Sequence, residues 1–259
     1  MAAVLIPEAT DDTSTAPRGV REKFLLTLRT PRRGRGFWYG LAIDVLWPFV
    51  MIFTRSGWHG GRHIPAEGPV LIASNHVSFA DPVTVTAYVL AHGRIPRYLA
   101  KAGLWKVPVV RSVLAGGRHI PVHRGTSKAT DAYRDAVKAV EAGECVLVFP
   151  EGTFTADPDG WPSVKQAKSG IARLALATGA PVVPIGHWGT QFVLPPKGRF
   201  PRLLPRRRVV ICTGEPVDLA DLLGQEPTRE VVEEATRRIV KGIVEQVERA
   251  RGEKAPRGV

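Results

Sequence analysis

Two residues capable of acid–base chemistry, His76 and Asp81, stand five positions apart. They lie in the segment 74–82, which follows a predicted strand and opens a predicted helix. On one continuous helix the two side chains would point about 140° apart, whereas a strand-to-helix turn can bring them together. The Asp81 carboxylate would then accept a hydrogen bond from one imidazole nitrogen and leave the other as a base for a substrate hydroxyl. The alternative interpretation is a helix-capping aspartate beside an unrelated histidine.

A second candidate site lies where the apolar run 145–149 ends, at Glu151, Gly152 and Thr153. Loops at the carboxyl ends of strands are where α/β folds place their ligands. The Glu151 carboxyl group can hold a hydroxyl or a cation there, and Gly152 lets the backbone approach a ligand closely. An ordinary strand-to-loop turn is the alternative interpretation.

A third candidate consists of arginines beside glycines. Arg118 follows two glycines and Arg124 precedes one, at the two ends of the short predicted strand 119–122. The guanidinium fork suits a phosphate group, and a solvated arginine is the alternative. His119 and His123 share a face of this strand, but an extended chain separates them by ~13 Å. We therefore expect no shared metal ion.

These candidates need a scaffold, and the chain from Ile64 onward alternates short apolar runs with helical patterns, which indicates an α/β fold. The predicted strands are 68–74, 97–100, 119–122, 145–149, 181–186 and 207–213. The predicted helices are 82–92, 104–114, 127–142, 168–179 and 228–250. We expect this α/β domain to occupy residues 58–251 and a flexible tail to occupy 252–259.

Composition narrows the class of protein. The chain has 259 residues, of which 44% are hydrophobic, and this excludes intrinsic disorder as the overall state. Its two cysteines, Cys145 and Cys212, exclude a disulfide scaffold, and their apolar surroundings predict buried thiols in a cytosolic setting. A formal net charge of +12 points to an anionic partner: nucleic acid, a phosphorylated ligand or an anionic membrane.

The N-terminal region favours the membrane among these partners. Residues 1–17 are expected to be a disordered tail, and 18–57 a basic and aromatic helical segment that associates with a membrane. Asp44 and Pro48 interrupt its apolar run 37–53, so we expect it to lie in one leaflet rather than to span the bilayer. A buried core helix is the alternative. The protein would then be monotopic, on the cytoplasmic face of the plasma membrane.

Taken in order, the motifs resemble those of the PlsC-type 1-acylglycerol-3-phosphate acyltransferases, glycerophospholipid enzymes with a His-x4-Asp motif. The segment 75–81 matches that motif, 117–124 matches the family's glycine-to-arginine block, and 149–153 matches its Phe-Pro-Glu-Gly-Thr block. The likeness covers residues 58–215. It implies a mixed, mostly parallel sheet flanked by helices, as in the glycerol-3-phosphate acyltransferases.

The resemblance also implies a reaction. His76, held by Asp81, would act as general base in the transfer of an acyl group from a thioester to lysophosphatidic acid, giving phosphatidic acid. The donor would be acyl-CoA or an acyl carrier protein thioester, with no metal or other cofactor. The remaining site residues would bind the acceptor: Lys101, Arg118 and Arg124 its phosphate, and Glu151, Gly152 and Thr153 its glycerol or the oxyanion.

One departure from the family pattern leaves the acceptor open. The family often has arginine after Glu-Gly-Thr, where this chain has Phe154, and Arg118 is our candidate to compensate. Glycerol-3-phosphate or another lysophospholipid is therefore an alternative acceptor. A basic membrane-binding or nucleic-acid-binding protein without catalysis is the alternative class. We expect no nucleic acid as a partner, because the aromatic residues gather in one N-terminal run instead of interleaving with the basic ones.

Overall fold

The computed structural model describes Glu22 and residues 36–123, 129–196, 198, 200–256 and 258. The predicted tail 1–17, nearly all of the basic stretch 18–35 and the candidate residue Arg124 lie outside the described residues. What was predicted for them stays a prediction.

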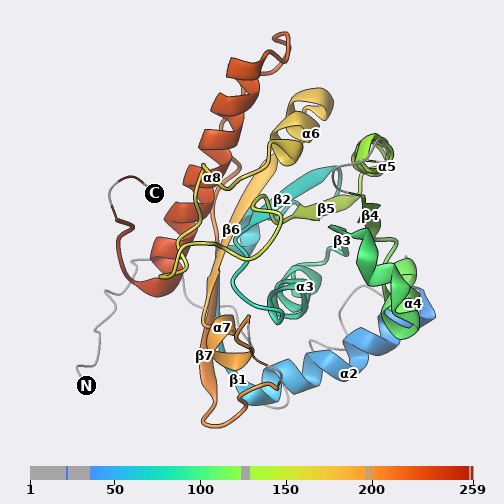
Figure 1. Cartoon of the computed structure of the whole chain (residues 1–259), viewed down its shortest axis with the longest axis vertical. Helices are drawn as coiled ribbons and strands as arrows, with labels where there is room; N and C mark the ends of the chain where they lie inside the picture. Colours follow the sequence, from blue (N-terminus) through green and yellow to red (C-terminus); the bar gives the residue numbers. More distant parts are fainter. Residues whose placement is uncertain are drawn as a thin grey trace.

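One seven-stranded sheet forms the centre of the protein, in the order β1-β7-β6-β2-β5-β3-β4 (Figure 1). Neighbouring strands are parallel except β6 and β7, which are antiparallel. This confirms the expected mixed, mostly parallel sheet and places the carboxyl ends of β2, β3, β5 and β6 at one edge. The strands are β1 (Thr54–His59), β2 (Val70–Ser74), β3 (Pro96–Lys101), β4 (Ile120–Val122), β5 (Cys145–Val148), β6 (Val182–Trp188) and β7 (Arg207–Thr213).

Helices cover both faces of the sheet, because its inner strands are apolar on both sides. In β2, Leu71 and Ala73 belong to the core under α5, α6 and α8, whereas Val70 and Ile72 belong to the core under α2 and α3. Figure 1 shows α8 and α3 on opposite sides of the sheet. The helical elements are α2 (Phe37–Phe53), η1 (Gly61–His63), α3 (Asp81–Ala91), η2 (Ala102–Lys106), α4 (Pro108–Gly116), α5 (Ala129–Glu141), α6 (Gly170–Thr178), α7 (Thr190–Val193) and α8 (Arg229–Arg251).

Two of the differences between the predicted and the observed elements have a clear physical reason. The sheet already begins at Thr54, inside the segment expected to associate with a membrane, because β1 pairs in parallel with β7. The expected helix 104–114 is divided into η2 and α4 at Val107, which has an extended backbone. Proline at position 108 explains the division, because the residue before a proline is disfavoured in the helical conformation.

Apart from Asp44, the side chains of helix α2 are apolar or aromatic around its whole circumference, but only one side is buried. Tyr39, Ile43, Trp47 and Met51, spaced four residues apart, face the core. The rest of the helix surface exposes a second set of large apolar residues: Phe37, Trp38, Leu41, Val45, Phe49, Ile52 and Leu46, of which Leu46 lines the cavity described below. No helix among the described residues is long and apolar enough to cross a membrane.

The start of α2 is fixed by a close backbone contact with the end of α4. Gly36 N–H donates to Gly116 O over 2.8 Å. A Cβ atom at Gly36 would lie 2.7 Å from the Gly116 Cα atom. The two backbone segments can therefore approach this closely only because residue 36 is glycine. The contact holds α2 against α4, and these two helices form one side of the cavity described below.

Candidate active site

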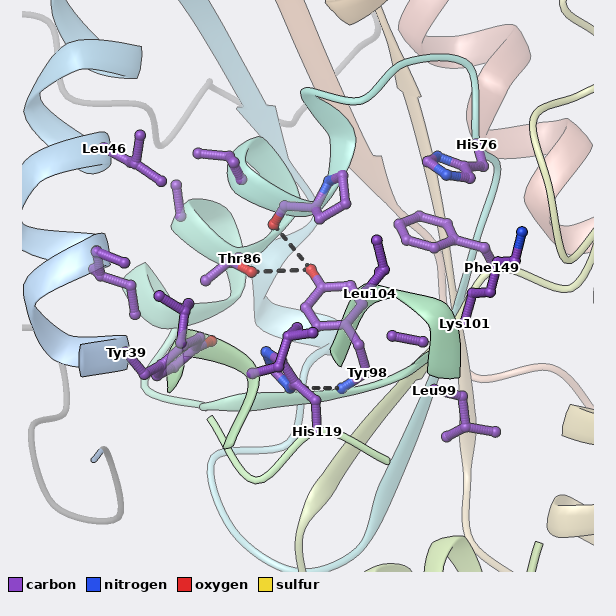
Figure 2. Close-up of a pocket in the computed structure, with 18 of the residues that line it drawn as sticks. Tyr39, Leu46, His76, Thr86, Tyr98, Leu99, Lys101, Leu104, His119 and Phe149 are labelled. Atoms are coloured by element: carbon purple, nitrogen blue, oxygen red, sulfur yellow. Dashed lines mark hydrogen bonds between the residues drawn. The ribbon is translucent and has the colours of Figure 1, made fainter. Parts of the chain in front are cut away.

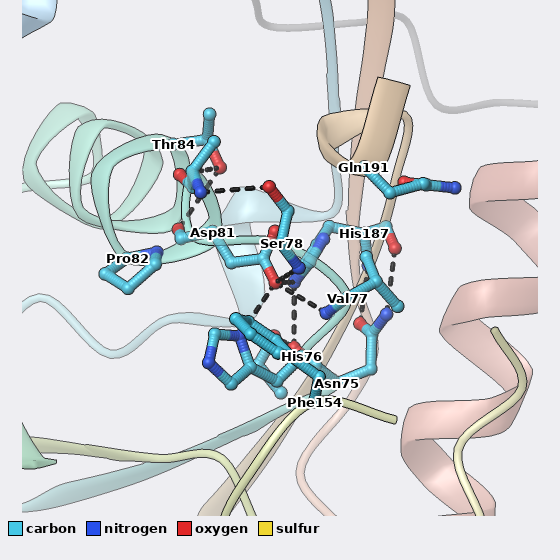
Figure 3. A network of polar contacts seen from close by, with 12 residues as sticks. Asn75, His76, Val77, Ser78, Asp81, Pro82, Thr84, Phe154, His187 and Gln191 are labelled. Carbon is cyan, nitrogen blue, oxygen red and sulfur yellow. Dashed lines mark hydrogen bonds and ion pairs between the residues drawn. The ribbon is translucent and has the colours of Figure 1, made fainter. Parts of the chain in front are cut away.

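His76 and Asp81 meet across the bend between β2 and α3 (Figure 3). His76 Nδ1 lies 2.8 Å from Asp81 Oδ2, a hydrogen-bond distance. The same carboxylate oxygen accepts from the backbone N–H groups of Val77 at 2.6 Å and Ser78 at 2.8 Å. The loop therefore wraps around its own aspartate, and the predicted contact between the two residues is present.

Asp81 is fully buried, yet its environment favours the ionised form. Burial by itself raises the pKa of this carboxyl group. The facing His187 and the hydrogen bond from His76 outweigh that effect and hold the pKa below its usual value. A carboxylate fixed in this way keeps the proton of His76 on Nδ1, and Nε2 is then the nitrogen left to act as a base.

A second histidine, which the sequence analysis did not single out, completes the network. His187 lies near the end of β6 and is fully buried. Its backbone N–H donates to Asn75 Oδ1 at 2.9 Å and its carbonyl accepts from Asn75 Nδ2 at 3.0 Å. The Asn75 amide thus continues the β2–β6 pairing beyond Ser74, where β2 ends.

The ring of His76 is held between two aromatic side chains. Phe149 stacks on it with ring centroids 4.3 Å apart, and Phe154 lies at 4.5 Å (Figure 3 shows the latter). Thr155 N–H donates to His76 O at 2.7 Å, which ties the loop after β5 to the loop after β2. The position where the resembled family often has arginine is therefore an apolar wall of the site.

Glu151 is a second buried carboxyl group, on the loop after β5. Its side chain is 4% exposed, and neither carboxyl oxygen has a hydrogen-bond partner among the described residues. Burial raises its pKa to about 7, and nearby Thr155 and the Ser163 backbone only partly oppose this. The group can therefore exist in both protonation states near neutral pH, with unused hydrogen-bonding capacity.

Gly152 and Thr153, predicted near the glycerol or the oxyanion, lie on the same turn. Gly152 has a positive φ of 72° and its N–H donates to Phe149 O at 2.9 Å. That N–H is engaged in the turn, and the predicted contact of this segment with the glycerol or the oxyanion stays a prediction. Thr153 is exposed beside it.

Of the three predicted phosphate ligands, the structure describes Lys101 and Arg118. Lys101 ends β3 at the same edge of the sheet as His76 and is exposed at the rim of a cavity. Arg124 lies outside the described residues.

Arg118 is not where the prediction placed it. It precedes β4, at the amino edge of the sheet, where it forms a salt bridge of 2.8 Å with Glu144. Its carbonyl accepts from Arg97 Nε there. Glu144 directly precedes β5, whereas His76 follows the carboxyl end of β2. A parallel sheet keeps these two edges apart, so Arg118 does not belong to the site around His76.

An apolar cavity of about 310 Å³ opens beside His76 (Figure 2). Its walls come from α2, α3, β3 and α4, with Ile43, Val83, Ala100 and Val113 among the lining residues. Figure 2 shows His76 and Lys101 toward one end and Tyr39 and His119 toward the other. The cavity is a suitable space for an apolar chain whose head lies at His76.

Two of the polar residues on the cavity wall, Tyr98 and His119, have hydrogen-bond partners within the protein. The Tyr98 hydroxyl lies 3.0 Å from Thr86 Oγ1 and donates to Pro82 O at 3.1 Å. His119 Nδ1 accepts the backbone N–H of Tyr98 at 3.1 Å, and burial lowers the His119 pKa to about 4, which leaves the ring neutral. Among the described residues, no group of three or more His, Cys, Asp or Glu is arranged to hold a metal ion.

Fold and site together define a class: a three-layer α/β protein with a hydrogen-bonded His–Asp pair at the carboxyl edge of its sheet, beside an apolar cavity. A model of the Acyltransferase family matches residues 55–188, just over half of the chain. The chain belongs to this family.

Several known proteins that are similar to this chain are named acyltransferases. A chloroplast 1-acyl-sn-glycerol-3-phosphate acyltransferase of Brassica napus is 28% identical over 197 residues, which is 74% of this chain and 54% of the relative. The 1-acyl-sn-glycerol-3-phosphate acyltransferase of Bacillus subtilis is 26% identical over 174 residues, 66% of this chain and 79% of the relative. Against the first three curated relatives, the chain spans between 42% and 54% of their length.

A solved structure has the same fold. The crystal structure of the 1-acyl-sn-glycerophosphate (LPA) acyltransferase PlsC from Thermotoga maritima superimposes with a TM-score of 0.58, covering 90% of this chain and 89% of that one. The two sequences are 22% identical, so this likeness concerns the fold alone.

Proposed function

We propose that the protein is an O-acyltransferase that moves a fatty acyl group from an acyl thioester to the free hydroxyl of lysophosphatidic acid, which yields phosphatidic acid. The observation that carries the proposal is the 2.8 Å contact between His76 Nδ1 and Asp81 Oδ2, on a ring that also lines the apolar cavity. Family membership and the names of the relatives support the same reaction.

The chemistry requires one base and no covalent intermediate on the protein. His76 Nε2 takes the proton of the acceptor hydroxyl as its oxygen attacks the thioester carbonyl carbon. The C–S bond then breaks, and the leaving thiolate takes the proton from the His76 imidazolium. Asp81 stays ionised throughout, so it stabilises the positive ring that forms between these two steps.

Substrate binding divides between polar and apolar parts of the site. We propose that Lys101 at the rim, together with Arg124, binds the acceptor phosphate, and that Glu151 binds its glycerol hydroxyl groups. The apolar cavity suits an acyl tail with its reacting end at His76. Positioning of this kind can supply several kcal/mol of the barrier, roughly 7 or more in favourable cases.

We further propose that the exposed side of α2 lies in one leaflet of an anionic membrane, at its cytoplasmic face. Val45 is 61% exposed and Phe37 74% exposed on that side. Two more exposed residues, Phe200 at 81% and Leu204 at 74%, precede Arg206, which bonds to the last turn of α2 through Met51 O. A helix that is apolar on its solvent side is typical of interfacial binding.

The reaction is tested with purified protein in detergent, supplied with matched panels of thioesters and acceptors. Acyl-CoA and acyl carrier protein thioesters are offered as donors, and lysophosphatidic acid, glycerol-3-phosphate and other lysophospholipids as acceptors, with products identified by mass spectrometry. We expect phosphatidic acid as the main product. Because Phe154 replaces a cation often found in the family, preference for another acceptor would revise the substrate and leave the acyl transfer standing. No product from any pair would refute the proposal.

Membrane binding is tested by flotation with anionic and zwitterionic vesicles. We expect flotation with anionic vesicles and a clear loss in the variant Val45→Glu. Val164→Glu is the matched control, because Val164 is also a partly exposed valine but lies on the loop before α6. Equal flotation of both variants would contradict the role of α2.

A further inference from the structure

His187 is a buried titratable residue to which the proposed reaction assigns no step. It is fully buried at the carboxyl end of β6, and Asp81 and His76 are the titratable groups that face it. Among the described residues, its side chain has one hydrogen bond, from Nε2 to Asn75 O at 2.8 Å. The same nitrogen lies 3.7 Å from Asp81 Oδ2. Figure 3 shows the two side chains facing each other.

These contacts fix where the proton of His187 resides. A carbonyl oxygen can only accept, so Nε2 must carry the hydrogen that binds Asn75 O. Nδ1 is buried and has no hydrogen-bond partner among the described residues. Protonation at Nδ1 would create a buried charged donor without an acceptor, which is strongly unfavourable. Burial accordingly lowers the pKa of His187, and the ring is a neutral donor at neutral pH.

The position of this donor connects it with the base. Asn75 directly precedes His76, so the bond from Nε2 to Asn75 O holds the chain that carries the base. The Nε2–H group also faces the one Asp81 oxygen that receives the hydrogen bond of His76. The His187 ring on β6 thereby supports both His76 and Asp81, which meet across the bend between β2 and α3.

We propose that His187 is a positioning residue for acyl transfer: its neutral Nε2–H fixes Asn75 O and faces Asp81 Oδ2, so that His76 is held in register with an ionised aspartate. This inference rests on the proposed function, because it gives His187 a task only if His76 acts as a base. His187 itself does not line the cavity and touches no substrate in this scheme.

Three variants separate this role from simple packing. His187→Gln places an amide N–H near the position of Nε2, His187→Asn reaches only as far as Nδ1, and His187→Leu has no donor. We expect kcat to fall about tenfold or more in the Leu and Asn variants, since a hydrogen bond to a charged network is lost. The KM values of donor and acceptor should stay within about twofold, and Gln should restore most of the rate.

A matched control is available at the other end of α3. His92 Nδ1 contacts Tyr88 O at 2.8 Å and His92 is partly buried, but it lies beyond the last turn of the helix that begins with Asp81. His92→Gln should therefore leave kcat unchanged. If Gln and Asn at position 187 have equal rates, or if KM changes and kcat does not, the proposal is overturned. The Gln–Asn contrast remains informative if the Leu variant fails to fold.

A second measurement does not depend on activity. In protein labelled with 15N-histidine, the His187 signals are assigned by their loss in His187→Gln. We expect a protonated Nε2 and a bare Nδ1 at pH 7. A ring protonated on Nδ1 at this pH would overturn the inference. Absence of acyl transfer in the wild type, with this spectrum present, would instead refute the proposed function.

Discussion

The site contains two buried carboxyl groups whose surroundings differ in nearly every respect. Asp81 Oδ2 accepts hydrogen bonds from His76, Val77 and Ser78, and the pKa of Asp81 lies below its usual value. Glu151 is almost as deeply buried, has no hydrogen-bond partner among the described residues, and has a pKa raised to about 7. Burial is common to both, so the donors around each group decide its charge.

This difference indicates two tasks. Asp81 is a fixed charge whose donors come from its own loop, so it can orient His76 before any substrate arrives. The carboxyl oxygens of Glu151 accept no hydrogen bond from the described residues, so a substrate hydroxyl can donate one to them. The first group is preorganised and the second is completed by its ligand.

The largest effect is expected from removal of the base itself. His76→Ala should lower kcat by about 10³-fold, within the range that general-base catalysis supplies, with little change in thermal stability because the ring is at the surface of the cavity. Initial rates and a thermal melt on the same preparation check this. A well-folded variant with wild-type activity would show that His76 is not the base.

The next effect concerns Glu151 as the ligand-completed carboxyl group. Glu151→Ala should raise the KM of the acceptor about tenfold, which corresponds to the loss of one hydrogen bond of about 1.4 kcal/mol, and leave the KM of the donor unchanged. Full kinetics with each substrate varied in turn test this. A larger change in the KM of the donor would show that Glu151 binds the donor and not the acceptor.

The cavity offers a smaller and more selective effect. Ala42, on α2, lines the cavity, and Ala42→Phe would fill part of its volume. We expect shorter acyl chains in the product, with the total rate reduced by no more than about tenfold for short donors. Leu41→Phe is the control, because Leu41 is 43% exposed on the outer side of the same helix. An unchanged chain distribution in Ala42→Phe would show that the tail binds elsewhere.

The charge difference between the two carboxyl groups also predicts how stability depends on pH. The folded-state pKa of Glu151, about 7, is above the ordinary value of 4.5, so the folded protein binds this proton more tightly than the unfolded chain. The contribution of Glu151 to stability is thus largest below pH 4.5 and is lost as pH rises toward about 7, by about 3 kcal/mol.

Glu151→Gln removes this titratable group. The free energy of unfolding should therefore depend less on pH between about 4.5 and 7. Denaturant unfolding at several pH values measures the slope for both proteins. Equal slopes in the wild type and the variant would mean that Glu151 keeps its ordinary pKa in the folded state.

Much of the scaffold could be predicted because its signals are local. The strands β5 and β7 are apolar runs bounded by turn residues, and α8 shows its buried face at helical spacing. Strand β1 was missed because its sequence, Thr-Arg-Ser-Gly-Trp-His, has neither an apolar run nor alternation. It forms a strand because it pairs with β7, and this pairing joins residues that are far apart in the sequence.

The site was predictable to the same extent and for the same reason. The contact of His76 with Asp81 depends on five residues of loop and was expected. The contact of Asn75 with His187 joins residues 112 positions apart and was not. Arg118 was misplaced because alternation tells which face of a strand a side chain takes, and not at which edge of the sheet its strand begins.

The central claim, that Asp81 is a fixed charge for the base His76, is tested most directly by Asp81→Asn, which keeps the size of the side chain and removes its charge. Initial rates are measured with acyl-CoA and lysophosphatidic acid on protein shown to be folded by its thermal melt. The account predicts a fall in kcat of at least about 100-fold with both KM values nearly unchanged. A folded Asp81→Asn protein that turns over within about twofold of the wild-type rate would contradict it.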